Sequence, residues 1–111
     1  MTCQELAECV TRLEPASSPQ DVARICLLLA NAHADLEALK DEARLRKACQ
    51  QTSLKLQLAT DQHAAMTQEL EELAGSDPQK FSQEQVWVLI RAIKVQSQVL
   101  QLYVGQPALD V

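Results

Sequence analysis

The stretch that decides the fold runs from Gln20 to Ala74, QDVARICLLLANAHADLEALKDEARLRKACQQTSLKLQLATDQHAAMTQELEELA, fifty-five residues without a glycine or a proline. The glycines and prolines of the chain all lie outside it, at Pro15, Pro19, Gly75, Pro78, Gly105 and Pro107. Because glycine costs about 1 kcal/mol and proline about 3 kcal/mol inside a helix, these residues mark segment boundaries. The stretch therefore predicts one very long central helix over residues 19–74, about 80 Å long if unbroken.

Capping signals predict a shorter helix on each side of the central one. Two residue pairs have the spacing of a capping box, Thr2 with Glu5 and Ser82 with Gln85. In this motif the hydroxyl and the carboxylate or amide satisfy each other's backbone donors at the start of a helix. We therefore expect helices over residues 3–14 and 83–104, followed by a frayed tail over 105–111.

The apolar residues of the central stretch form two sets at heptad spacing. The first set is Val22, Ile25, Leu29, Ala32, Leu36 and Leu39, and the second is Leu45, Cys49, Thr52, Leu56, Ala59, His63, Met66, Leu70 and Leu73. The step from Leu39 to Leu45 is six residues where a heptad repeat has seven, which turns the apolar face by about 100°. Either the two halves face different partners or the helix bends. A kink near residues 40–53, giving a compact four-helix bundle, is the alternative to a continuous helix.

The predicted helix over residues 83–104 is apolar on two nearly opposite faces. One face carries Val86, Ile90, Ile93 and Leu100, and the other carries Val88, Ala92, Val95, Val99 and Leu102. A helix that is apolar nearly all round is buried on both sides. We expect the first face to pack on the central helix, which leaves the second face for another contact.

These elements predict an all-α fold: an elongated antiparallel helical hairpin, a coiled-coil-like arrangement of three helices in a single domain spanning residues 1–111. The short links at 15–18 and 76–82 fold both outer helices back onto the central one. Both outer helices are too short to cover the middle of the central helix, near residues 33–51. That segment should therefore expose apolar side chains.

The surfaces left uncovered supply the predicted partner-binding residues. They are Leu36, Leu39, Leu45, Trp87, Val88, Val95, Val99 and Leu102. Burying an exposed leucine or valine is worth about 1.5–3 kcal/mol, so a covering chain is favoured. Trp87 fits either a core position or the centre of an interface, where tryptophan is enriched. We expect protein partners that form a homo- or hetero-oligomer through helix packing.

Charge and hydropathy exclude several classes of partner. The net charge of −5 disfavours nucleic acid, because phosphate binding needs a concentrated positive surface. The longest apolar run, residues 25–30, is far shorter than the roughly twenty residues of a membrane span, and the first ten residues do not resemble a signal peptide. The protein is expected in the cytoplasm or the nucleus. Residues 38–55 carry a local charge of +3, either a solvated face or a docking patch for an acidic surface.

No residue pattern indicates catalysis, a cofactor or a metal. The four cysteines and two histidines match none of the spacings of zinc sites, and in a reducing compartment the cysteines are free thiols. The redox alternative is Cys49, whose thiolate Arg46 and Lys47 would stabilise. With two glycines in the chain there is no phosphate-binding loop, so we expect no enzyme activity and no small-molecule substrate.

The sequence thus favours a non-enzymatic helical protein–protein interaction module, a structural or adaptor subunit of a larger cytoplasmic assembly that acts through coiled-coil packing. The alternative is a small helical chaperone that sequesters an amphipathic helix of a client protein. An enzyme or a metal carrier forms the third class, for which the chain contains no motif.

Overall fold

The computed structural model describes residues 1–105, and within them every regular element is a helix. The elements are α1 (Cys3–Leu13), α2 (Pro19–Ala32), η1 (Leu36–Lys40), α3 (Glu42–Ala74), η2 (Pro78–Lys80) and α4 (Gln83–Val104), where η marks a short 3₁₀ helix. The predicted all-α class is confirmed. Apart from Gly105, the predicted tail over 105–111 lies outside the described residues.

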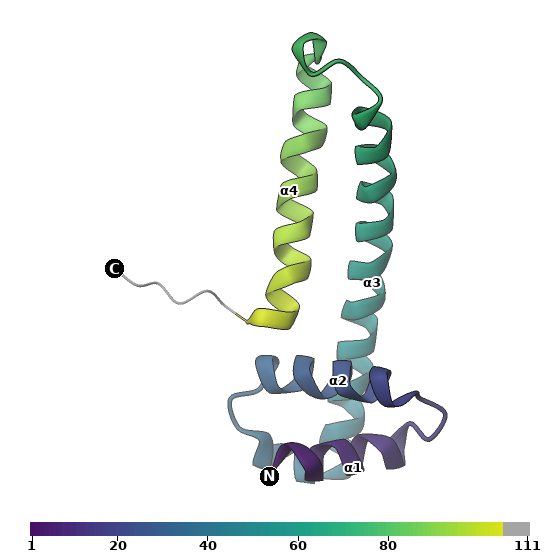
Figure 1. Ribbon diagram of the computed structural model, residues 1–111. Coiled ribbons are helices and arrows are strands. Elements are labelled where there is room, and N and C mark those ends of the chain that lie inside the picture. The colour runs from purple at the N-terminus through teal and green to yellow at the C-terminus, as the bar shows by residue number, and fades with distance from the viewer. Residues whose placement is uncertain (106–111) are drawn as a thin grey trace.

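An upright helical hairpin stands on a base of crossed helices. The helices α3 and α4 run antiparallel side by side, joined at the upper end through η2 (Figure 1). At the lower end, α1 and α2 lie across the first half of α3 and, together with η1, form the base (Figure 1). The molecule measures 56 × 40 × 19 Å, with a radius of gyration of 18.1 Å. It is therefore somewhat elongated, as predicted.

The continuous helix predicted over residues 19–74 is wrong, because the chain leaves the helix between Ala32 and Glu42. His33 is extended, with φ −122° and ψ 117°. The carboxylate of Asp35 accepts a hydrogen bond of 3.0 Å from the backbone N–H of Glu37, and Asp41 is the N-cap residue of α3. Aspartate favours the start of a helix over its interior, so Asp35 and Asp41 begin new helical segments here without glycine or proline. The break at residues 33–41 precedes most of the kink region expected at 40–53.

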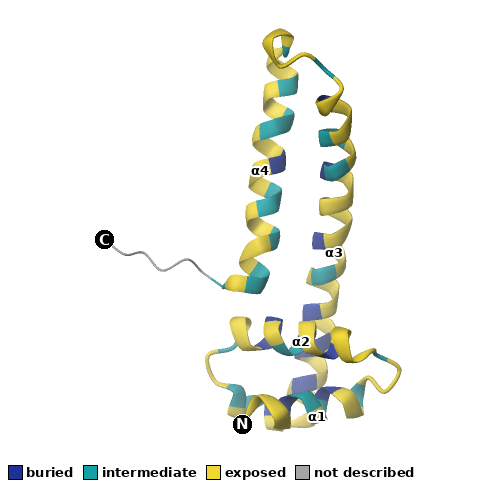
Figure 2. Cartoon of the chain, in the orientation of Figure 1, coloured by how far each residue is buried: buried dark blue, intermediate teal, exposed yellow. Residues whose placement is uncertain are grey.

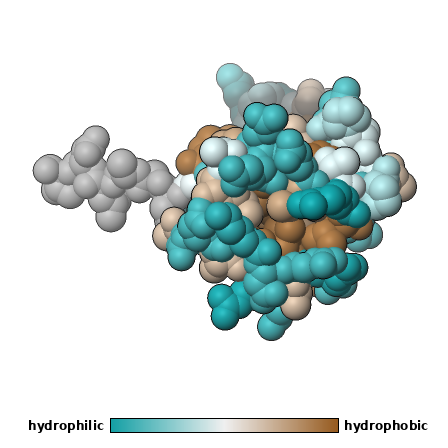
Figure 3. All heavy atoms as spheres, turned by 90° about the horizontal axis from the view of Figure 1, so that it is seen from below, coloured by the Kyte–Doolittle hydropathy of each residue, from teal (hydrophilic) through white to brown (hydrophobic). Residues whose placement is uncertain are grey.

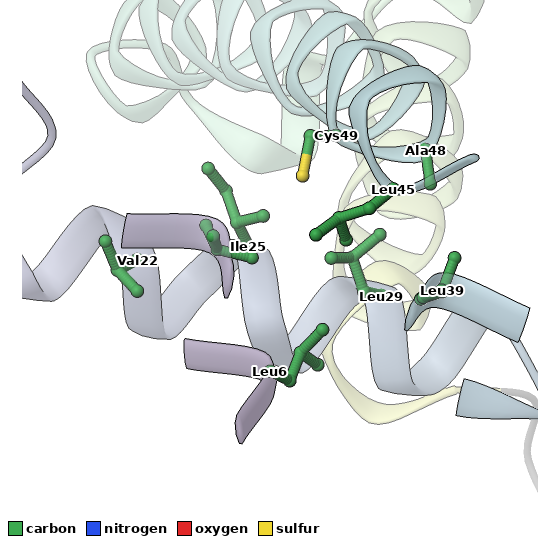
Figure 4. Close-up of a cluster of buried hydrophobic side chains, with 9 residues drawn as sticks. Leu6, Val22, Ile25, Leu29, Leu39, Leu45, Ala48 and Cys49 are labelled. Atoms are coloured by element: carbon green, nitrogen blue, oxygen red, sulfur yellow. The ribbon is translucent and has the colours of Figure 1, made fainter. Parts of the chain in front are cut away.

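The break lets α2 turn back and close a hydrophobic core in the base. Side chains from α1, α2, η1 and α3 point toward one another there (Figure 4). The buried members of this core are Leu6, Val10, Val22, Ile25, Leu29, Leu39, Leu45, Ala48 and Cys49. Each large side chain buried contributes about 1.5–3 kcal/mol, which outweighs the few helical hydrogen bonds lost at the break.

The middle of the predicted central helix is consequently not exposed, and this expectation is corrected. Leu39 and Leu45 are each only 3 % exposed, and half-buried Leu36 packs against the same core. The physical reason is again the turn between α2 and α3, which brings the two apolar sets of the long stretch into contact with each other. The side chains in this segment that were expected to need another chain are covered by other helices of the same chain.

The second apolar set predicted from the sequence forms one face of α3, against which the rest of the chain packs. We call this face the α3 seam. Its members are Leu45, Cys49, Thr52, Leu56, Ala59, His63, Met66, Leu70 and Leu73, all buried or half-buried except His63. The base covers the lower half of the seam, and α4 covers the upper half (Figure 2). One continuous apolar face of α3 is thus completed by two different parts of the chain.

Both predicted capping boxes begin helices, although only the second has both of its hydrogen bonds. The Thr2 hydroxyl accepts a hydrogen bond of 3.1 Å from the Glu5 backbone N–H at the start of α1. At the start of α4, the Ser82 hydroxyl accepts from the Gln85 N–H (3.2 Å), and the Gln85 side chain accepts from the Ser82 N–H (2.8 Å). These local signals place the N-termini of α1 and α4 where the sequence predicted them.

A pair of proline substitutions tests the break between α2 and α3. Ala34 lies in the break, and no described group accepts a hydrogen bond from its N–H. The preceding residue, His33, is already extended, as a residue before proline should be. Ala34→Pro should therefore change the free energy of unfolding by no more than about 1 kcal/mol. The matched change Ala64→Pro, at an exposed position inside α3, should cost about 3 kcal/mol or more. Urea unfolding followed by circular dichroism measures both, and equal large losses would show that residues 33–35 are helical.

Candidate interaction surface

The helix α4 packs on α3 through its small and β-branched face. Ala92 is the one buried residue of α4, at 3 % exposure, and Ala59 of the α3 seam is 7 % exposed. Half-buried Val88, Val95 and Val99 share the face of Ala92. Small residues on facing helices let the two axes approach closely, and the valines fill the space around them.

This packing reverses the roles predicted for the two faces of α4. The face of Val88, Val95 and Val99, expected to be free, is half-buried and contains the buried Ala92, and Leu102 lines a groove with α2 and α3. The face expected to pack on the central helix, with Ile90 and Ile93, is exposed. The reason is steric: the face that contains Ala92 fits closer to α3 than the face built from isoleucines.

Polar contacts fix the register of the hairpin. The Gln96 side-chain amide lies 2.6 Å from Nδ1 of His63 on α3. The two side chains form a hydrogen bond between α3 and α4, in which the donor depends on the tautomer of the imidazole. This contact explains why His63 is found on the α3 seam although it remains exposed. A hydrogen bond takes the place of an apolar pair at this position and fixes the axial register of α4 relative to α3.

A single asparagine attaches the end of α4 to the base. The Asn31 side chain, on α2, donates to the backbone carbonyls of Leu102 (3.2 Å) and Tyr103 (2.6 Å). The last carbonyls of a helix have no partners within that helix, and they lie at the negative end of its dipole. Asn31 satisfies two of them and thereby holds α4 in one orientation relative to α2.

The outer side of α4 carries a row of exposed residues, all apolar except one serine, which we call the α4 stripe. It consists of Val86, Ile90, Ile93, Ser97, Leu100 and Val104, with Trp87 at its edge. Its apolar members are between 43 % and 70 % exposed. The six residues from Val86 to Val104, Ser97 included, are spaced 4-3-4-3-4, the pattern that places one side of a helix against a second helix. In Figure 2 the outward side of α4 is exposed along its whole length.

The stripe has a charge of its own. From Gln85 to Gly105 the chain contains no acidic residue, and its only charges are those of Arg91 and Lys94. Neither cation forms an ion pair with a residue in the described part of the chain. The α4 stripe is therefore apolar with a positive border, on a protein whose net charge is −5.

Other exposed apolar side chains are more scattered. Leu54 and Leu58 lie on α3 away from its buried seam, and Leu27 lies on α2. Seen from below, apolar atoms emerge among hydrophilic ones on the underside of the base (Figure 3). A groove between α1, η1 and α3 combines Leu13 with cationic neighbours such as Arg12. None of these places has the length or the regular spacing of the α4 stripe.

Three of the five cations in the basic block at residues 38–55 form ion pairs with nearby acids. The pairs are Lys40 with Glu37 (2.7 Å), Arg44 with Asp41 (3.7 Å) and Arg46 with Glu42 (3.2 Å). All three pairs are solvent-exposed, so each contributes little to stability. They support the interpretation of this block as a solvated helix face.

Of the eight predicted partner-binding residues, only Trp87 lies on the exposed side of α4. Leu39 and Leu45 are in the base core, and the others are half-buried against it or on the inner face of α4. The sequence interpretation missed five exposed residues as binding candidates: Val86, Ile90, Ile93, Leu100 and Val104. Four of them had been identified as a face, and the 4-3-4-3-4 spacing that they form together with Ser97 and Val104 was the signal that distinguishes a coiled-coil stripe.

Neither Cys26 nor Cys49 is an activated nucleophile. Burial, with smaller contributions from Glu14 and Cys26, raises the pKa of the Cys49 thiol to about 11. Burial, followed by the nearby Cys3, also raises the pKa of Cys26. A raised pKa keeps the thiol protonated at neutral pH, which contradicts the alternative of a Cys49 thiolate stabilised by basic neighbours.

Two further findings concern ligands and membranes. Among residues 1–105, no group of three or more histidine, cysteine, aspartate or glutamate side chains is arranged to hold a metal ion. No helix in that same range is both long enough and apolar enough to cross a membrane.

Comparison with known proteins adds no relative. No protein-family model matches the chain, and neither the curated proteins nor the solved structures yield a match.

Substituting Asn31 tests how α4 is held on the base. Asn31→Asp replaces the donor by a carboxylate that faces two carbonyls and the negative end of a helix, so the free energy of unfolding should fall by about 1–2 kcal/mol. Gln51→Glu, which adds the same charge at an exposed position of α3, should have an effect within about 0.5 kcal/mol. Thermal unfolding measures both, and equal effects would show that the Asn31 contacts do not hold α4.

Proposed function

We propose that this protein is a non-enzymatic helical interaction module, a structural or adaptor subunit that joins a larger cytoplasmic assembly by coiled-coil packing of α4. The observation that carries the proposal is the α4 stripe, a row of heptad-spaced apolar side chains exposed over the full length of a helix. Exposed apolar patches of this kind, bordered by polar residues, mark interaction surfaces.

The manner in which α4 is held supports this role. The helix is fixed on its inner side by Ala92 and the valines, in register by Gln96, and at its end by Asn31. A surface held rigidly in the free protein loses little conformational entropy on binding. The stripe is therefore pre-organised for a partner, whereas the inner face contributes to folding.

The second candidate is a small helical chaperone that sequesters an amphipathic helix of a client protein. The same stripe favours it, because a heptad-spaced surface accepts many helices with an apolar face. The two candidates differ in the lifetime of the complex. A subunit stays in a stable stoichiometric assembly, while a chaperone releases its client.

Two neighbouring substitutions separate binding from folding. Ile93→Glu lies on the stripe, where the side chain is 70 % exposed, and should leave the unfolding free energy within about 0.5 kcal/mol of wild type while it removes the partner. Val95→Glu lies on the inner face and should cost several kcal/mol in stability. Gln68→Glu, at an exposed position of α3, is the matched control for added charge.

The measurement is affinity isolation of the tagged protein from cells, followed by size-exclusion chromatography with quantitative mass spectrometry. Wild type and Gln68→Glu should retain the same stoichiometric partner, and folded Ile93→Glu should lose it. Loss of the partner during chromatography would favour the chaperone. An Ile93→Glu protein that keeps the full complex would refute the stripe as the interaction surface.

A further inference from the structure

The occupant of the α4 stripe follows from its spacing and its charge. Resting on the proposed function, we propose that the stripe binds one amphipathic α-helix of a different protein, and that the apolar face of this helix is bordered by aspartate and glutamate.

The spacing identifies a helix as the occupant. The stripe runs from Val86 to Val104 in steps of 4-3-4-3-4, so it stays on one side of α4 for about 27 Å. Such a surface complements knobs at the a and d positions of a second helix, about eighteen to twenty residues long. Ser97, in the middle of the stripe, is small enough to let the two helices come close and limits the registers in which they fit.

The positive charge beside the stripe indicates which residues border the apolar face of the partner helix. With the stripe at the a and d positions of a heptad, Trp87, Lys94 and Gln101 occupy the flanking e positions, and Arg91 lies one row further out, at a b position. Arg91 and Lys94 have no ion-pair partner among residues 1–105. Residues that flank a coiled-coil seam set partner choice through opposite charges. Carboxylates on the facing helix would supply the partners that this chain does not.

The same charges argue against a second copy on the stripe. When two α4 stripes overlap fully and antiparallel, residue 95 is the midpoint, and the flanking Lys94 of one copy lies beside Lys94 of the other. In a parallel pair, Lys94 would face Leu89 of the other copy, which offers no carboxylate. Because residues 85–105 contain no carboxylate, the antiparallel pair places like charges together, and neither arrangement gives the cations a partner.

Trp87 and Arg91 further indicate that this side of the stripe determines which helix binds. They are four residues apart and therefore neighbours on the helix surface. Trp87 is 58 % exposed, and tryptophan and arginine are the residue types that most often dominate binding energy at interfaces. A partner helix with a carboxylate near Arg91 and an apolar side chain against Trp87 would contact both residues.

Two designed peptides test the charge of the occupant directly. Both are stapled helices of about twenty residues with the same leucine and isoleucine seam, one with glutamate and one with lysine at every flanking position. Fluorescence anisotropy at low ionic strength should show the glutamate peptide binding wild type about tenfold more tightly than the lysine peptide. The double variant Arg91→Glu/Lys94→Glu should reverse this order, and Ile93→Glu should bind neither peptide.

Three results would overturn the inference, and they separate it from the proposed function. Equal affinity for both peptides, or preference for the lysine peptide, would refute the acidic border while leaving the stripe an interaction surface. Sedimentation of wild type as a dimer or filament that Ile93→Glu dissociates would identify a second copy as the occupant, again with the stripe intact. Failure of both peptides to bind would refute the inference. The proposed function would then be tested separately, by whether Ile93→Glu loses the partner that wild type retains when isolated from cells.

Discussion

The structure depends on one constraint, that the single apolar face of α3 must be covered along its whole length. A helix of 33 residues is about 50 Å long, more than any other helix of the chain can cover. The chain solves this with two partners for one face: the base packs on Leu45 and Cys49, and α4 packs on Ala59 and Leu73. The break between α2 and α3 is a consequence, because only a folded-back α2 reaches the lower half of the seam.

The exposed stripe follows from the same constraint. The upper half of the α3 seam accepts the face of α4 that contains Ala92, and the contacts of Asn31 and Gln96 allow α4 no rotation to the other face. The larger apolar face is therefore held outward. Burial of the exposed parts of these large side chains favours a complex, against which the entropy cost of association must be set. The apolar surface that completes no core of its own is the part of the molecule that another helix can use.

The sequence was informative where the signal is local and less so where two segments compete. Capping residues such as Thr2 and Ser82, and the spacing of the α3 seam, could be predicted because each depends on neighbours along one helix. The break at Asp35 could not, since aspartate is only mildly unfavourable in a helix and the decision lies in the distant core around Leu29. The outward face of α4 could not either, because both faces are apolar and only the fit of Ala92 against α3 distinguishes them.

Hydroxyl-radical footprinting of the isolated monomer, resolved by residue with mass spectrometry, tests this account most directly. It measures the solvent access of both faces of α4 in one experiment, with each face serving as the control for the other. We expect faster oxidation of the exposed Ile90, Ile93 and Leu100 than of the half-buried Val95 and Val99. The opposite pattern, with the valines oxidised and the isoleucines protected, would contradict it, because α4 would then pack on α3 through the stripe assigned to the partner.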